Sequence, residues 1–280
     1  MKLYWGPHTC AIGIHILLEE IGEPYETEKV DTAGGQTRQP PFMAVNPKGK
    51  VPTLVRDDGS VLTEFSAIAT WLARTNPRAN LLPDDPEIEA RAVEAMAYVE
   101  GTIHGQGFAR VFVPQMFEPQ DVVHTTLGLG KASVERQGRE LVETGFAILD
   151  PQLGRVPYVA GDVFTIADAA LFYAERWAPP RNIAMPVNVA AHADAAVGAE
   201  GPRAVGRELR RMPPPSDASK SIKRIDWEKH ACSLSKSFIM SPYRPMTLLG
   251  CRPSTSAFWD SERIPKSRTG CAPAMVSQST

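Results

Sequence analysis

The secondary structure encoded by the sequence changes character once along the chain. Before residue 76, short runs of β-forming residues alternate with stretches whose apolar residues recur at helical spacing. From residue 87 to about residue 154 only the helical pattern occurs, and the segment between is rich in Pro, Asn and Asp. This arrangement predicts a small mixed unit, a linker and an all-helical unit, so the predicted fold class is α/β plus all-α.

The first unit is predicted to have the order β-α-β-loop-β-β-α. An Asp-Gly turn at 58–59 joins the last two strands into a hairpin. Thr9 is the expected N-cap of the first helix, and Gly22 is its expected C-cap. Strands are expected at residues 2–5, 25–30, 51–55 and 60–63, and helices between Thr9 and Gly22 and at 66–74.

Within the second unit, Thr165 and Asp168 have the spacing of a capping box, in which each side chain pairs a backbone N–H that the start of a helix leaves free. A carboxylate in a helical core could instead be catalytic. Capping explains both residue types and their spacing, so a structural role for Asp168 is the favoured interpretation.

Residues 211–280 differ in composition from the rest of the chain. They hold 11 Lys+Arg and 5 Asp+Glu, whereas residues 1–210 hold 19 and 27. They also hold 13 of the serines and three of the four cysteines, without a regular apolar period. We therefore expect a tail of low order there, and we expect function in residues 1–210.

Several classes of protein are excluded by what the sequence lacks. No window approaches the ~20 apolar residues that a membrane helix needs, and the start lacks the apolar stretch of a secretory signal, so a cytoplasmic protein is expected. The cysteine spacing offers no metal site, and no glycine-rich phosphate loop occurs. The acidic body has no basic stripe for nucleic acid.

Four motifs occur in an order and spacing that belong together. Cys10 follows the first strand at a helix start, and the others are Asn-Pro-Lys-Gly-Lys-Val-Pro-Thr-Leu at 46–54, Leu-Thr-Glu-Phe-Ser-Ala-Ile at 62–68 and Gly-Asp-Val-Phe-Thr-Ile-Ala-Asp at 161–168. Over about residues 1–200 the chain resembles the glutathione S-transferases, and Cys10 matches the bacterial beta class. The resemblance implies a thioredoxin-like domain at 1–78 that binds glutathione, an all-helical substrate domain at 86–210, and a homodimer.

The same resemblance implies which residues hold glutathione. The Val51-Pro52 bond would be cis, with the Val51 backbone paired to the cysteinyl part of the peptide; taken alone, Pro52 could simply start an edge strand. Glu64 would lie near the γ-glutamyl ammonium group, although an acid there also complements the helix dipole. Phe65 stands where many members have Ser, so its backbone N–H would bind the carboxylate and Ser66 would have to replace the missing hydroxyl.

Cys10 and Thr9 are the two candidates for activating the thiol. The resemblance places Cys10 near the glutathione sulfur, where a mixed disulfide can form. A helix N-terminus lowers the pKa of a cysteine, which would make Cys10 a reactive thiolate, whereas a buried cysteine can also be a plain apolar residue. The Thr9 hydroxyl would donate a hydrogen bond to the glutathione thiolate.

Two further residues are implied less directly. His104 matches a histidine directed at the thiol site from the helical domain, but the lysine that follows it in some members is Gly105 here. A lone histidine is also often an ordinary polar residue. Arg38 could reach the glycine carboxylate of glutathione or be a solvated charge. Phe108, Phe112 and Met116 are expected to line the second-substrate pocket or the core.

The predicted function is conjugation of the glutathione thiolate, the co-substrate, to small electrophiles in a detoxification role. Two alternatives stay open. Cys10 makes glutathione-dependent thiol–disulfide exchange equally natural chemistry, and Phe65 with the missing lysine is compatible with a module that binds glutathione without turnover. The residues do not identify the electrophile.

Overall fold

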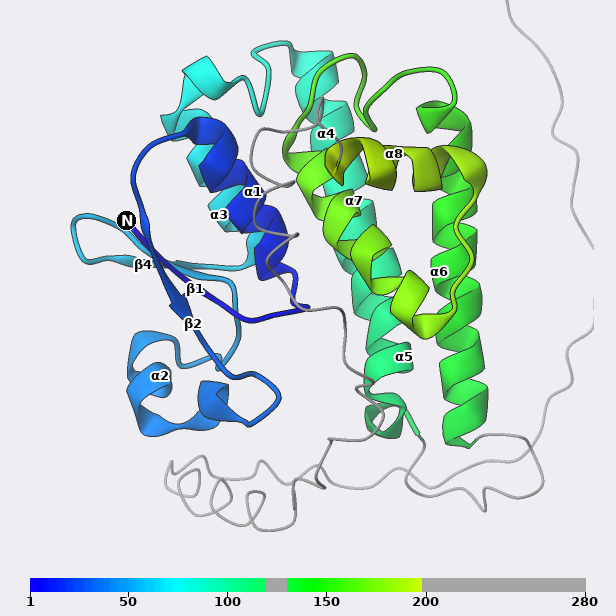
Figure 1. Cartoon of the computed structure of the whole chain (residues 1–280), viewed down its shortest axis with the longest axis horizontal. Coiled ribbons are helices and arrows are strands. Elements are labelled where there is room, and N and C mark those ends of the chain that lie inside the picture. Colours follow the sequence, from blue (N-terminus) through cyan, green and yellow to red (C-terminus); the bar gives the residue numbers. More distant parts are fainter. Residues whose placement is uncertain (119–129, 198–280) are drawn as a thin grey trace, which may run out of the picture. The chain divides into compact units, whose positions relative to one another are not determined.

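The computed structural model describes residues 1–118 and 130–197, which belong to one compact unit, Met1–Lys223. In Figure 1 the sheet and the helices next to it lie in the left half of the picture, and a helical bundle lies in the right half. The predicted tail at 211–280 lies outside the described residues. Among the described residues, no helix is both long enough and apolar enough to span a membrane.

The sheet has four short strands in the order β2-β1-β3-β4. β1 runs parallel to β2, and β3 lies antiparallel to both β1 and β4, so Leu3 is paired with Thr27 on one side and with Leu54 on the other. Leu3 and Leu54 are fully buried. The strands are β1 (Lys2–Trp5), β2 (Glu26–Lys29), β3 (Thr53–Val55) and β4 (Val61–Thr63), which confirms the predicted hairpin.

Two helices lie between the sheet and the bundle, and two short helices precede β3. α1 contacts β1, α3 contacts β4, and both contact α7 of the bundle (Figure 1). This is the thioredoxin-like arrangement that was predicted. The helices are α1 (Ala11–Ile21), α3 (Phe65–Thr75), η1 (Gln36–Arg38) and α2 (Pro40–Val45).

The start of α1 differs from the prediction by one residue. Cys10 is the N-cap, and its φ of −61° and ψ of −15° are already helical. The Thr9 hydroxyl does not cap the helix, because it donates a hydrogen bond to the Gly6 carbonyl at 2.7 Å. The end is as predicted: Gly22 has a φ of 76°, which glycine adopts at no steric cost, and its N–H bonds the Leu18 carbonyl.

The bundle forms around α7, in which every residue except Arg176 is buried. This confirms that the second part of the chain is all-helical over the described residues. Its elements are η2 (Pro77–Ala79), α4 (Pro86–Tyr98), η3 (Val99–Phe108), α5 (Ala109–Phe112), η4 (Pro114–Met116), α6 (Lys131–Leu153), α7 (Ile166–Trp177), η5 (Pro179–Arg181) and α8 (Val187–Val197).

The helix that begins at Pro86 changes its winding part of the way along. It is α-helical to Tyr98 and then continues as the π-helix η3, a rarer winding that is often found at functional sites. Close packing on α6 accompanies the change: a Cβ on Gly107 would come within 2.6 Å of Val142 Cγ2. The wider turns of η3 carry Glu100 and His104, both of which line the cavity described below.

The capping role predicted for Asp168 is confirmed. Its carboxylate is fully buried and accepts hydrogen bonds from the Thr165 N–H at 2.8 Å and the Thr165 hydroxyl at 2.9 Å. It also accepts the Val159 N–H at 2.7 Å and faces His192 Nε2 at 3.3 Å. Asp168 therefore joins three parts of the helical core and is used structurally.

Candidate functional site

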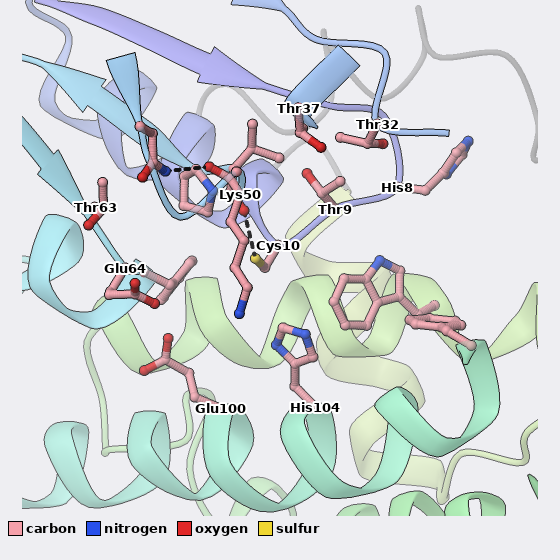
Figure 2. A pocket seen from close by; sticks show the side chains of 17 residues that line it. His8, Thr9, Cys10, Thr32, Thr37, Lys50, Thr63, Glu64, Glu100 and His104 are labelled. Carbon is pink, nitrogen blue, oxygen red and sulfur yellow. Dashed lines mark hydrogen bonds between the residues drawn. The ribbon is translucent and has the colours of Figure 1, made fainter. Parts of the chain in front are cut away.

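A cavity of about 400 Å³ lies where the loops of the sheet face η3 and α7. Figure 2 shows loop residues on one side of it and Glu100 and His104 on the other. The lining residues are His8, Thr9, Cys10, Thr32, Thr37, Asn46, Gly49, Lys50, Val51, Pro52, Thr63, Glu64, Phe65, Glu100, His104, Phe112 and Trp177. Seven of the nine predicted site residues are among them; Ser66 and Arg38 are not.

The loop before β3 is held by one buried side chain. Asn46 is 1% exposed, and its amide nitrogen donates to the Lys50 carbonyl at 2.8 Å and to the Thr53 hydroxyl at 2.9 Å. Its amide oxygen accepts the Lys48 N–H at 3.0 Å. These bonds fix the backbone that leads into the Val51-Pro52 peptide bond, which is cis as the resemblance implied.

Replacing Asn46 with alanine is expected to lower the free energy of unfolding by about 1–3 kcal/mol, because a buried carbonyl and a backbone N–H each lose a partner. Denaturant unfolding measures the loss, and hydrogen exchange at the Lys48 amide reports loosening of the loop. Gln39→Ala, which removes an exposed amide next to α2, is the control. Equal stability of the two variants would show that the Asn46 bonds do not hold the loop.

Glu64 occupies the corner between β4 and α3. Its φ of 72° is in a region that non-glycine residues seldom adopt, which costs of order 1–3 kcal/mol and is tolerated chiefly at functional sites. The carboxylate pairs with the Lys48 ammonium at 2.7 Å, and the same ammonium donates to the Thr63 hydroxyl at 2.9 Å. The pair is more than half exposed, so it orients the carboxylate and contributes little stability.

Phe65 and Ser66 turn in different directions at the start of α3. The Phe65 ring is buried against Tyr173, with the ring centroids 5.3 Å apart, and the absence of a side chain on Gly13 makes room for it. Only its backbone N–H, at a helix N-terminus, is then suited to an anion in the cavity. Ser66 is not among the lining residues and hydrogen-bonds to Glu100, so its contact with glutathione stays a prediction.

Cys10 lies at the end of the cavity formed by the start of α1. Its sulfur donates to the Val51 carbonyl at 3.8 Å. Burial, and then the nearby Glu100 carboxylate, raise the pKa of its thiol to about 12, against the lowering effects of the helix start and Lys50. The expectation of a lowered pKa is therefore wrong, because loss of hydration outweighs the helix N-terminus.

Thr9 also lines the cavity, but its hydroxyl proton is already used. The 2.7 Å bond to the Gly6 carbonyl leaves the oxygen as an acceptor and not as a donor. A thiolate needs a donor. The Cys10 thiol also donates, to the Val51 carbonyl, but this bond is long at 3.8 Å and an S–H is a weak donor, so Cys10 is the candidate whose hydrogen is more easily given to a bound sulfur.

His104 enters the cavity from η3, as the resemblance implied (Figure 2). Its Nδ1 lies 3.2 Å from the Tyr173 hydroxyl, and its ring lies edge-on to Trp177 with centroids 4.9 Å apart. Burial, aided by the Lys50 charge, lowers the pKa of His104 to about 4, so the imidazole is neutral near pH 7. A neutral, fixed imidazole can give or accept a hydrogen bond but supplies no charge.

The structure places the remaining predicted residues, Arg38 and three apolar side chains, in different surroundings. Arg38 is exposed outside the lining, where its guanidinium donates to the Lys48 carbonyl at 3.4 Å. Phe112 lines the cavity, whereas Phe108 is fully buried in the core and Met116 is 68% exposed. Among the described residues, no group of three His, Cys, Asp or Glu side chains gathers that could hold a metal ion.

Sequence reasoning missed several cavity residues, chiefly Lys50, Glu100 and Trp177. Lys50 belongs to the motif at 46–54, and its position next to Val51 is the signal that could have identified it as a cavity residue. Glu100 gave no such signal, because it reaches the cavity only through the winding of η3.

Comparison with known proteins adds to this geometry. Residues 9–75 match the family model described as "Glutathione S-transferase, N-terminal domain". The chain is 34% identical over 180 residues to Glutathione S-transferase GstA of Escherichia coli O157:H7, covering 64% of this chain and 82% of that protein.

Two solved structures share the fold. One is a glutathione transferase homolog from Sulfitobacter with bound glutathione, with a TM-score of 0.65, 27% identity and coverage of 75% of this chain and 96% of that one. The other is a sphingomonad glutathione S-transferase complexed with glutathione, with a TM-score of 0.60, 28% identity and coverage of 75% and 98%.

Proposed function

The chain belongs to the glutathione S-transferase family, and from that premise we propose that it conjugates the thiolate of glutathione to small electrophiles in the cavity around Cys10. The observation that carries the proposal is the meeting of three features in one cavity. These are the Cys10 thiol, the cis Val51-Pro52 loop and the N-terminus of α3. Two relatives of the same fold hold glutathione.

The cavity offers a partner for each part of the peptide. The Val51 backbone would pair with the cysteinyl residue, as an added strand pairs with a sheet edge. The Glu64 carboxylate would meet the γ-glutamyl ammonium, and the Phe65 N–H would meet its carboxylate, favoured by the dipole of α3. Because Ser66 is bonded to Glu100, we expect one hydroxyl contact fewer at this end. Arg38, outside the lining but beside Gly49, would meet the glycine carboxylate.

The glutathione thiolate is the reacting species. The thiol gives its proton to water, and the resulting thiolate sulfur forms a bond to an electrophilic carbon. A leaving group then departs with its bonding electrons, or the adduct takes a proton from solvent. Cys10 stays protonated near pH 7, so its S–H would donate to the thiolate, and the neutral His104 would orient the partners from the opposite wall.

A second activity is thiol–disulfide exchange, which the position of Cys10 in the cavity favours. A Cys10 thiolate would attack the glutathione sulfur of a disulfide that contains glutathione, displace the other sulfur as a thiolate and form a mixed disulfide with glutathione. The thiolate of a second glutathione would then release Cys10 and leave as glutathione disulfide. The pKa of about 12 keeps the thiolate fraction of Cys10 small near pH 7. We therefore place conjugation first.

The wider context of the activity is part of the same proposal. We propose a detoxification role in the cytoplasm, a homodimer as the working form, and residues 1–78 and 86–210 as the glutathione-binding and substrate domains. Size-exclusion chromatography with light scattering tests the dimer.

Glutathione binding, conjugation and disulfide reduction, measured on the full chain under reducing conditions, test the function. Calorimetry is expected to show binding, and aryl halides, enones and epoxides are expected to react faster than in the uncatalysed reaction at the same pH. N-acetylcysteine, which lacks the γ-glutamyl and glycine parts, is the control and should react no faster than without protein. Binding without either activity would leave a module that binds glutathione without turnover.

A further inference from the structure

Lys50 is the one lysine or arginine among the described residues that line the cavity. Its ammonium makes no hydrogen bond or ion pair with the residues that the structure describes. The neighbouring Lys48, which is not a lining residue, contrasts with it, since its ammonium is bonded to Glu64 and Thr63. An unpaired cation that faces a cavity is available to a negative charge bound there.

The backbone of Lys50 is firmly placed. Its carbonyl accepts hydrogen bonds from the Asn46 amide at 2.8 Å and the Thr53 hydroxyl at 2.9 Å. The next carbonyl along the loop, that of Val51, accepts the Cys10 thiol. Figure 2 shows the Lys50 side chain leaving this loop beside Cys10, with its ammonium toward Glu100 and His104. The fixed loop therefore directs a positive charge across the site where a sulfur would bind.

The other ionisable groups around the cavity do not supply this charge. Glu64 and Glu100 are acids, and burial raises the pKa of Glu100. His104 is neutral near pH 7, and burial with the Arg176 charge lowers the pKa of His8. Tyr173, behind His104, has a pKa raised well above its usual value by burial. A thiolate placed among these groups would face two acidic side chains and a single cation, the exposed ammonium of Lys50.

We propose that Lys50 is a catalytic residue of the transferase reaction, whose ammonium stabilises the thiolate of bound glutathione. The inference rests on the proposed function. When the peptide displaces water from the cavity, a charge interaction across it strengthens because the local dielectric falls. The thiol releases its proton to solvent, and the negative charge that stays on sulfur faces the lysine. Lys50 also opposes, in smaller measure, the raising effect of Glu100 on the pKa of the Cys10 thiol.

The test compares Lys50→Gln and Lys50→Arg with Arg78→Gln, which removes the same charge from an exposed residue of η2 outside the lining. The thiolate absorbance of bound glutathione is followed against pH, together with kcat and KM. In Lys50→Gln the thiolate fraction near pH 7 is expected to fall about tenfold, as is kcat, with recovery at higher pH. Lys50→Arg, which keeps the positive charge, is expected to recover most of the thiolate fraction that Lys50→Gln loses, whereas Arg78→Gln is expected to behave like the unmodified chain.

A raised KM with an unchanged pH profile would overturn the inference, because it would show that Lys50 holds a carboxylate of glutathione. An unchanged Lys50→Gln variant would overturn it as well. A measurement that needs no glutathione separates the role of Lys50 from the proposed function. It is the rate at which Cys10 is alkylated near pH 8, followed by mass spectrometry of the peptide that contains Cys10. Lys50→Gln is expected to slow it about threefold or more, even in a chain without transferase activity. An equal rate would count against Lys50 alone.

Discussion

Replacing Asp168 with alanine is expected to lower the free energy of unfolding by about 3–5 kcal/mol, a large part of what a domain of this size has. The buried carboxylate accepts two backbone N–H groups, those of Thr165 and Val159, and both would be left unpaired. His192 would lose one of its two carboxylate partners, at 3.3 Å, and would keep Glu175 at 2.8 Å. Few other single changes remove so many buried bonds.

The charge on His192 adds to this cost. Burial opposes its charging, but the Glu175 and Asp168 carboxylates outweigh burial and raise its pKa to about 10. The imidazolium is therefore present near pH 7, and without Asp168 it would be held less well in a buried position.

Denaturant unfolding of the full chain under reducing conditions measures the effect. Asp162→Ala removes the same side chain from an exposed position in the loop before α7, and it is expected to stay within about 0.5 kcal/mol of the unmodified chain. If the Asp168 variant lost less than about 1 kcal/mol, the carboxylate would not be holding the three segments together.

Substitution of Cys10 is expected to separate the two chemistries. Cys10→Ala should reduce glutathione-dependent disulfide reduction by at least about a hundredfold, because no sulfur remains to form the mixed disulfide. Conjugation should fall by about tenfold, since the thiolate of glutathione loses one donor hydrogen bond. Cys10→Ser should lose disulfide reduction equally but keep conjugation within about threefold, because its hydroxyl still donates.

The rates of conjugation and of disulfide reduction decide between these outcomes. Glutathione affinity, measured by calorimetry, is the control for an intact site. Equal loss of conjugation in the Ser and Ala variants would mean that sulfur itself, and not hydrogen-bond donation, is what the conjugation step needs. Disulfide reduction that survives in Cys10→Ala would place the exchange chemistry on glutathione alone.

Much of the site was predictable because its parts are short motifs. Cys10, Val51, Pro52 and Glu64 were identified within motifs whose order carried the resemblance, and the structure brings all four to one cavity. The roles of these residues remain predictions. The hydrogen bond of Ser66 could not be predicted, because its partner is Glu100, a residue 34 positions further along the chain.

The sequence by itself determined the order of the elements, the change from a mixed to an all-helical part, the Gly22 cap and the Asp168 capping box. Each of these depends on neighbours a few positions apart, which the spacing of residue types records. Only the tertiary structure decided the direction in which the pKa of Cys10 shifts. It also decided that Lys50, Glu100 and His104 meet in one cavity. Burial and charge act through space between residues far apart in sequence, and for Cys10 the loss of hydration exceeded the local effect of the helix start.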